Sequence, residues 1–244
     1  MTALDNAVDA LQALLQRVED ASALDVENLW HIVTAQLTGW DPADRQAVIA
    51  ALGEYLPDML AGHAAVVADY TTVWYDALAP DEPFTATVPS GDLVPAERIR
   101  QSISWAVNAA TSTQTALAQL QGTVQRAVHD AQRATVAHNA AAEGIRYRRH
   151  TNYAGACNWC LTMATRGAIY KTATSAVKGH DNCKCIAVPA RKGTSYTMPA
   201  MVLDAEKRYL AARKQLEGAG DIPPTLDSIV KRMDQLDDAT SLVR

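Results

Sequence analysis

The sequence predicts a mainly α-helical protein, and three observations carry that prediction. Apolar residues recur at steps of three and four over most of the chain, which is the helical period. Alanine is abundant, whereas the 244 residues include only one Phe and 12 Gly, a balance that favours helices over a β-sandwich. Hydrophobic residues make up 48% and charged residues 20%, which is typical of a folded globular chain rather than a disordered one.

The N-terminal third predicts a series of helices. The first helix carries one apolar face, made by Leu4, Val8, Leu11, Leu15 and Val18. Asp25 is expected to cap a second helix. Asp41 followed by Pro42 marks a new start, since a cap followed by proline at the first helical position is a common N-terminal pattern. Pro57 is expected to break or kink the helix that begins there, with a further helix over about 58–78.

The middle of the chain predicts a linker and then long helices. Four prolines and one glycine without helical periodicity indicate an extended linker over about 79–95. Apolar spacing resumes after Pro95 and continues, polar and alanine-rich, to about Ala142. Gly144 is placed to end this helical region as a C-cap.

Three units are expected along the chain. Residues 1–94 form a helical N-terminal domain that includes the linker, and 95–200 form a second domain with the long central helices. Residues 201–244 form C-terminal helices, at about 201–216 and 226–242, separated by two prolines.

A short segment of the second domain differs in charge from the rest of the chain. Residues 143–193 contain nine Lys or Arg and two acidic residues, a net of +7, although the whole chain carries −5. The overall acidity argues against a protein whose whole surface binds nucleic acid. All four cysteines lie in this basic segment, which we expect to be a small Cys/His-rich loop module with little β-structure.

The cysteine spacing predicts a zinc site. Cys157 and Cys160 are separated by two residues, as are His180 and Cys183, and Cys185 lies two positions beyond Cys183. Two short hooks of this kind suit a tetrahedral zinc ion, which binds thiolate and imidazole. Two ligand sets remain open, because either His180 or Cys185 completes a set of four with the other three cysteines.

Two other interpretations of the cysteines compete with zinc. They are buried apolar thiols or disulfide partners in an extracellular particle, or one of them is a nucleophile, with Cys160 activated by His180. Disulfides are uncommon in a reducing cytoplasm, where we expect the chain to be made because it shows no secretory signal. No run of about eighteen apolar residues occurs, so we expect no membrane span.

The basic residues of the module are candidates for contact with nucleic acid. The candidate phosphate ligands are Arg146, Arg148, Arg149, Lys171 and Lys178. The alternative for the run IRYRRH is a solvated helix end, where cations complement the negative end of the helix dipole.

Several motifs together resemble one known family. They are the aromatic-acidic cluster WYD at 74–76, the C-x-x-C pair, ATRGAIY at 164–170 and the closing HDNCKC at 180–185. This combination resembles the phage Mu F-like minor head proteins of actinobacterial tailed phages, most clearly over about 125–190. Asp181 stands where many relatives have proline, and Lys184 where they have arginine.

The resemblance implies a head morphogenesis protein that associates with the portal. It implies a virion component at the capsid interior or portal vertex, assembled in the host cytoplasm. The implied partners are the portal protein, major capsid or scaffold proteins, and packaged double-stranded DNA. Some such relatives are described as capsid maturation proteases, so a protease is the alternative. The local candidates for that chemistry are Ser175 or Ser195 with His180 and Asp181.

Overall fold

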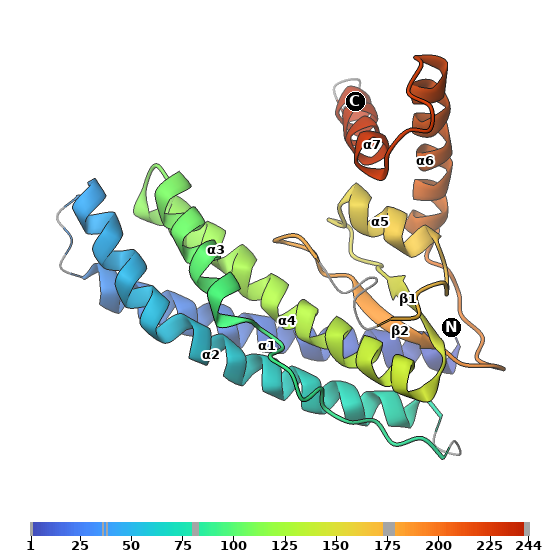
Figure 1. Cartoon of the computed structure of the whole chain (residues 1–244), viewed down its shortest axis with the longest axis horizontal. Coiled ribbons are helices and arrows are strands. Elements are labelled where there is room, and N and C mark those ends of the chain that lie inside the picture. Colours follow the sequence, from blue (N-terminus) through green and yellow to red (C-terminus); the bar gives the residue numbers. More distant parts are fainter. Residues whose placement is uncertain (1, 36, 38, 80–82, 173–178, 242–244) are drawn as a thin grey trace.

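The computed structural model is mainly helical, as the sequence predicts. It describes residues 2–35, 37, 39–79, 83–172 and 179–241. In this part of the chain lie seven helices and one two-stranded sheet, so the predicted fold class is confirmed. The first four helices lie side by side as an elongated bundle, and the later elements stand over one of its ends (Figure 1).

The first helix, α1 (Ala3–Thr34), is longer than predicted. A capping box between Thr2 and Asp5 starts it. The predicted second start at Asp25 is wrong, because the helix continues through this residue. The Asp25 carboxylate instead lies 2.8 Å from His63 Nε2 on the next helix.

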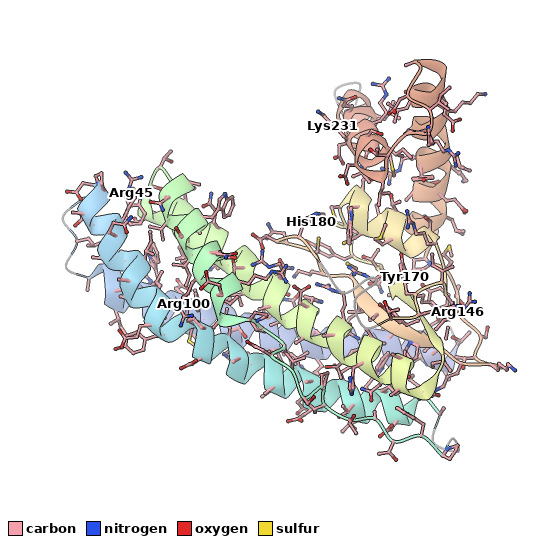
Figure 2. All side chains as sticks on the ribbon, in the orientation of Figure 1. Arg45, Arg100, Arg146, Tyr170, His180 and Lys231 are labelled. Carbon is pink, nitrogen blue, oxygen red and sulfur yellow. The ribbon has the colours of Figure 1, made fainter. Side chains whose placement is uncertain are left out.

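The second helix, α2 (Pro42–Ala77), begins at the predicted cap, Asp41. It passes through Pro57 without ending, so the predicted break is wrong. A proline inside a helix leaves the carbonyl four residues earlier without its N–H partner. Here that carbonyl belongs to Gly53, and Arg100 donates to it through Nε at 3.2 Å (Figure 2).

The central helices are α3 (Ala96–Ala109) and α4 (Thr113–Glu143). Ser112 caps α4 at its start, and Gly144 ends it in the left-handed region at φ 77°, as predicted. Side chains of α1 to α4 share one hydrophobic core, to which the second strand also contributes. α4 is buried around most of its circumference between 122 and 140, so it is the structural centre of the molecule.

The linker before α3 is extended, and an amide fixes it to α4. Asn139 Oδ1 accepts from the backbone N–H of Thr87 at 2.8 Å, and Asn139 Nδ2 donates to the Thr87 carbonyl at 2.9 Å. The linker therefore lies along the bundle and joins its packing.

The Cys/His-rich segment at 143–193, called the basic module below, contains more regular secondary structure than expected. Strands β1 (Arg146–His150) and β2 (Ile186–Ala190) pair antiparallel, and α5 (Asn158–Thr165) lies between them in sequence. The run IRYRRH was a candidate helix end and is instead mostly strand β1. The C-terminal helices α6 (Ala200–Gly218) and α7 (Leu226–Ser241) agree closely with prediction and pack with α5 in a separate apolar cluster.

Candidate metal centre

The two cysteine hooks occupy defined turns beside the central helix. Cys157 is the N-cap residue of α5, and Cys160 lies in its first turn, so the positive end of a helix faces the first pair. In the second hook, the Cys183 N–H donates to the His180 carbonyl at 3.3 Å. Asn182 closes this turn at φ 65°, a conformation that asparagine tolerates well.

The sulfur atoms of both hooks converge. The Sγ atoms of Cys157, Cys160 and Cys183 all lie within 4.8 Å of one another. Cys157 Sγ lies 3.6 Å from Cys183 Sγ, and Cys160 Sγ lies 2.7 Å from Cys185 Sγ. In a tetrahedral site with zinc–sulfur bonds near 2.3 Å, sulfurs lie about 3.8 Å apart. The Cys157–Cys183 separation is close to this spacing, whereas the Cys160–Cys185 separation is shorter than it. The three grouped cysteines, Cys157, Cys160 and Cys183, therefore fit a zinc ion best.

Cys185 is distinguished by two buried arginines. Arg149 and Arg133 are both fully buried, at 0% exposure. Arg149 Nη2 donates to Cys185 Sγ at 2.5 Å, and Arg133 Nη1 donates to the Cys185 carbonyl at 2.6 Å. Buried guanidinium groups need nearby negative charge. The Asp130 carboxylate pairs with Arg133, and a thiolate at Cys185 supplies negative charge beside Arg149.

The cysteines are electrostatically unequal. The thiol of Cys160 lowers the pKa of Cys185 well below its ordinary value, and Arg149 and Arg133 lower it further. The thiols of Cys160 and Cys183 likewise lower the pKa of Cys157. The hydrogen bond with Cys157 raises the pKa of Cys183 to about 12. The hydrogen bond with Cys157 also raises the pKa of Cys160. Without a metal, Cys157 and Cys185 therefore favour the thiolate, the form in which cysteine binds metal, and Cys160 and Cys183 favour the thiol.

His180 lies at the rim of this cluster. It is exposed, and its ring packs edge-on against Trp159 with centroids 5.0 Å apart (Figure 2). Among the described residues, the group of mutually close ligand atoms contains Cys157, Cys160 and Cys183, without His180 or Cys185. The geometry of this group therefore leaves both His180 and Cys185 as candidates for the fourth ligand.

Helix α4 holds the second hook in place. Asp181 forms an ion pair with Arg126 of α4 at 2.6 Å. Gly179 lies against Arg133, where an added Cβ would approach Nη2 to 2.5 Å. The hook is therefore fitted closely to this helix.

The side chain of Gln132, on α4, forms two hydrogen bonds with the backbone of strand β2. Its Nε2 donates to the Ala187 carbonyl, and its Oε1 accepts from the Ala187 N–H, both at 2.9 Å. Sequence reasoning missed Arg126, Gln132 and Arg133. The sequence feature that indicates their burial is the alanine-rich stretch around them. Small side chains let neighbouring backbone come close to the helix, and the polar side chains between them are then buried.

The candidate phosphate ligands have different surroundings. The prediction that Arg149 contacts phosphate is wrong, because its side chain is fully buried against Cys185 and is not accessible to nucleic acid. Arg148 is half-buried over the Tyr196 ring, 4.2 Å from its centroid. Arg146 and Lys171 are exposed, and Lys178 lies outside the described residues.

The strand register brings exposed cations into one row. Arg146 pairs with Ala190 of β2, and Tyr147 bridges Tyr170, so Arg146 and Lys171 lie opposite each other. Lys192 follows β2 at the same end and was not among the predicted residues. Arg146 and Lys192 line a hollow of about 730 Å³. We call Arg146, Lys171 and Lys192 the basic row; none of them forms an ion pair with a described residue.

The structure describes only part of the candidate protease groups, and two of those that it describes have other partners. The Asp181 carboxylate is paired with Arg126, and Cys160 is 1% exposed beneath Cys185. Ser175 lies outside the described residues. No described helix has the length and hydropathy to cross a membrane.

Comparison with known proteins gives one family. A family model described as VG15 protein matches residues 2–212, which is most of the chain. Neither the curated proteins nor the solved structures gave a match. The family is one of phage proteins, which agrees with the phage origin that the motifs indicate, without extending to the Mu F-like proteins specifically. The chain therefore belongs to the VG15 protein family.

Proposed function

We propose that this chain is a minor component of a phage head, associated with the portal during assembly and DNA packaging or ejection. Membership of a phage protein family supports a viral structural or accessory role. The portal association rests on the resemblance of HDNCKC and ATRGAIY to the Mu F-like minor head proteins.

One structural observation carries the proposal furthest. The motifs behind the resemblance meet in space, since the C-x-x-C pair and HDNCKC form one thiol cluster and Tyr170 bridges β1 beside it. Buried side chains of α4, Arg133 and Gln132, fix this module to the bundle. A rigid module on a long helical bundle suits a structural role at an assembly junction.

The thiol cluster is proposed to hold a structural zinc ion. Cys157, Cys160 and Cys183 supply three ligands, and we favour Cys185 as the fourth because Arg149 already stabilises its thiolate. Four thiolates around Zn²⁺ leave two negative charges, of which Arg149 offsets one within the buried site, while Arg133 is paired with Asp130. The ion would hold together two loops that have little apolar core of their own.

The basic row is proposed as a contact for packaged double-stranded DNA. Its three cations are not neutralised by described acidic residues, although the chain as a whole is acidic. Such a row binds the phosphate backbone without reading base sequence.

Co-expression with the portal protein of the same phage tests the portal association. The expected result is that the untagged chain is retained with tagged portal protein through size-exclusion chromatography. A matched sample with tagged major capsid protein tests capsid association separately. Failure to bind either protein contradicts the proposal. Site-specific cleavage of the capsid protein that Cys160→Ala abolishes would instead favour the protease alternative.

A further inference from the structure

Helix α2 presents an apolar stripe that the fold leaves uncovered. Four large apolar side chains on this helix are exposed: Tyr55 57%, Val66 44%, Tyr70 50% and Val73 68%. Tyr55 and Val73 are 18 residues apart, about five turns of helix, so they lie at the same angular position. Val66 and Tyr70 fall close to that line. We call these four residues the α2 stripe, and it extends over about 27 Å.

The α2 stripe differs from the face of α2 that packs in the core. Residues such as Leu56, Leu60 and Val67 point into the bundle and are fully buried. Gly62 lies along the stripe, and an added Cβ there would meet nothing within 4 Å. Single exposed apolar residues are common on soluble proteins, whereas several on one face, such as Val66, Tyr70 and Val73 within about two turns, mark an interaction site.

Acidic residues border the α2 stripe along one side. Glu54, Asp58 and Asp69 are exposed, and the helical period places all three on the same edge. None of them forms an ion pair with a described residue. We call these three residues the acidic border. An occupant of the stripe would gain from cations facing this edge, since charges of opposite sign select and orient partners.

We propose that the α2 stripe docks one amphipathic helix of another protein, with Lys or Arg along the edge that meets the acidic border. A docked helix is recognised through residues three and four apart, which matches the spacing of Val66, Tyr70 and Val73, with Tyr55 about three turns before them. Antiparallel pairing of two copies of α2 would place acidic border against acidic border, which disfavours that form of self-association. The proposal stands independently of the portal and zinc assignments.

Designed peptides test this docking site with the full-length chain. The probe is a synthetic amphipathic helix with a Leu/Ala face and Lys along one edge; its counterpart carries Glu at those positions. Fluorescence anisotropy is expected to show saturable binding of the Lys peptide and at least about tenfold weaker binding of the Glu peptide. The double variant Val66→Asp/Val73→Asp is expected to weaken Lys-peptide binding at least about tenfold.

Two further variants control the measurement. Leu203→Asp/Leu210→Asp alters exposed apolar residues on α6, at 46% and 57% exposure, and is expected to leave binding unchanged. Glu54→Lys/Asp58→Lys/Asp69→Lys is expected to reverse the peptide preference. Equal binding of both peptides, or binding that survives the α2 substitutions, would overturn the proposal. So would a concentration-dependent dimer in sedimentation that Val66→Asp/Val73→Asp abolishes, because a second copy would then occupy the stripe.

Discussion

Arg149 donates to the sulfur of Cys185 at 2.5 Å, and both side chains are almost completely buried. The arginine belongs to strand β1 and the cysteine precedes strand β2, so the contact joins both sides of the small sheet to the thiol cluster. We therefore expect the loss of this contact to lower both the stability of the module and its affinity for a metal ion.

Arg149→Met is expected to destabilise the protein strongly. It keeps an apolar stem but leaves the Cys185 thiolate without its main cation, a loss worth about 3–5 kcal/mol for a buried pair. Zinc affinity is expected to fall about 10–100-fold, as for other residues that support metal ligands. Urea unfolding and zinc competition with a chromogenic chelator measure the two effects. Arg146→Met on the same strand is the control, since Arg146 is exposed. Equal stability of both variants would contradict the role of Arg149.

Gln132→Leu is expected to loosen β2 from the bundle. The substitution keeps the side-chain size but removes both partners of Ala187, whose backbone groups are buried. Leaving two such groups unpaired costs about 3 kcal/mol. Urea unfolding measures the loss, and amide hydrogen exchange at Ala187 should accelerate. Gln114→Leu on the exposed start of α4 provides the control, and a similar change in both variants would rule out the edge contact.

His150 is expected to make stability fall between pH 6.5 and 4. Burial lowers its pKa from 6.5 to about 4, and its Nδ1 lies 2.9 Å from the Tyr196 hydroxyl. The folded state favours the neutral ring, so its contribution is complete above pH 6.5 and is lost as pH falls through 4. The difference corresponds to about 3 kcal/mol.

The pH dependence of unfolding in His150→Gln isolates this effect, because the variant keeps all four thiols. Its stability should decline less between pH 6.5 and 4 than that of the parent chain. His31→Gln on the exposed surface of α1 should follow the parent. An unchanged slope in His150→Gln would show that other groups control the acid sensitivity.

The basic row is expected to govern DNA binding. In Arg146→Gln/Lys171→Gln/Lys192→Gln, the slope of log affinity against log salt should decrease by about three, since each phosphate contact contributes about 0.9. Fluorescence anisotropy with a double-stranded oligonucleotide measures the slope. Lys207→Gln/Lys214→Gln/Lys231→Gln removes three cations from α6 and α7 and should leave it unchanged (Figure 2). Equal slopes for both variants would exclude the row as the binding site.

Local signals predicted most helix ends, and tertiary contacts explain the exceptions. The cap at Asp41 and the left-handed Gly144 act through neighbouring backbone, so sequence sufficed for both. Asp25 failed as a cap because it bonds to His63 on another helix. Pro57 failed as a break because Arg100, distant in sequence, satisfies the carbonyl that it leaves free.

The meeting of the cysteine segments was predictable from the sequence, and the side chains that support them were not. Cysteine spacing predicted which segments meet, since few arrangements use two short hooks. The burial of Arg133 and Arg149 depends on packing between α4 and the sheet, which charge and periodicity do not reveal. Arg149 therefore resembled a surface cation in the sequence, beside Arg146, which is one.

The metal content of the purified chain tests the central claim most directly. Protein prepared under reducing conditions without added chelator is analysed by inductively coupled plasma mass spectrometry and by thiol titration. We predict about one zinc ion per chain, with the thiols protected until the metal is removed. A chain without stoichiometric zinc, whether its four thiols react freely or are paired in disulfides, would contradict the account.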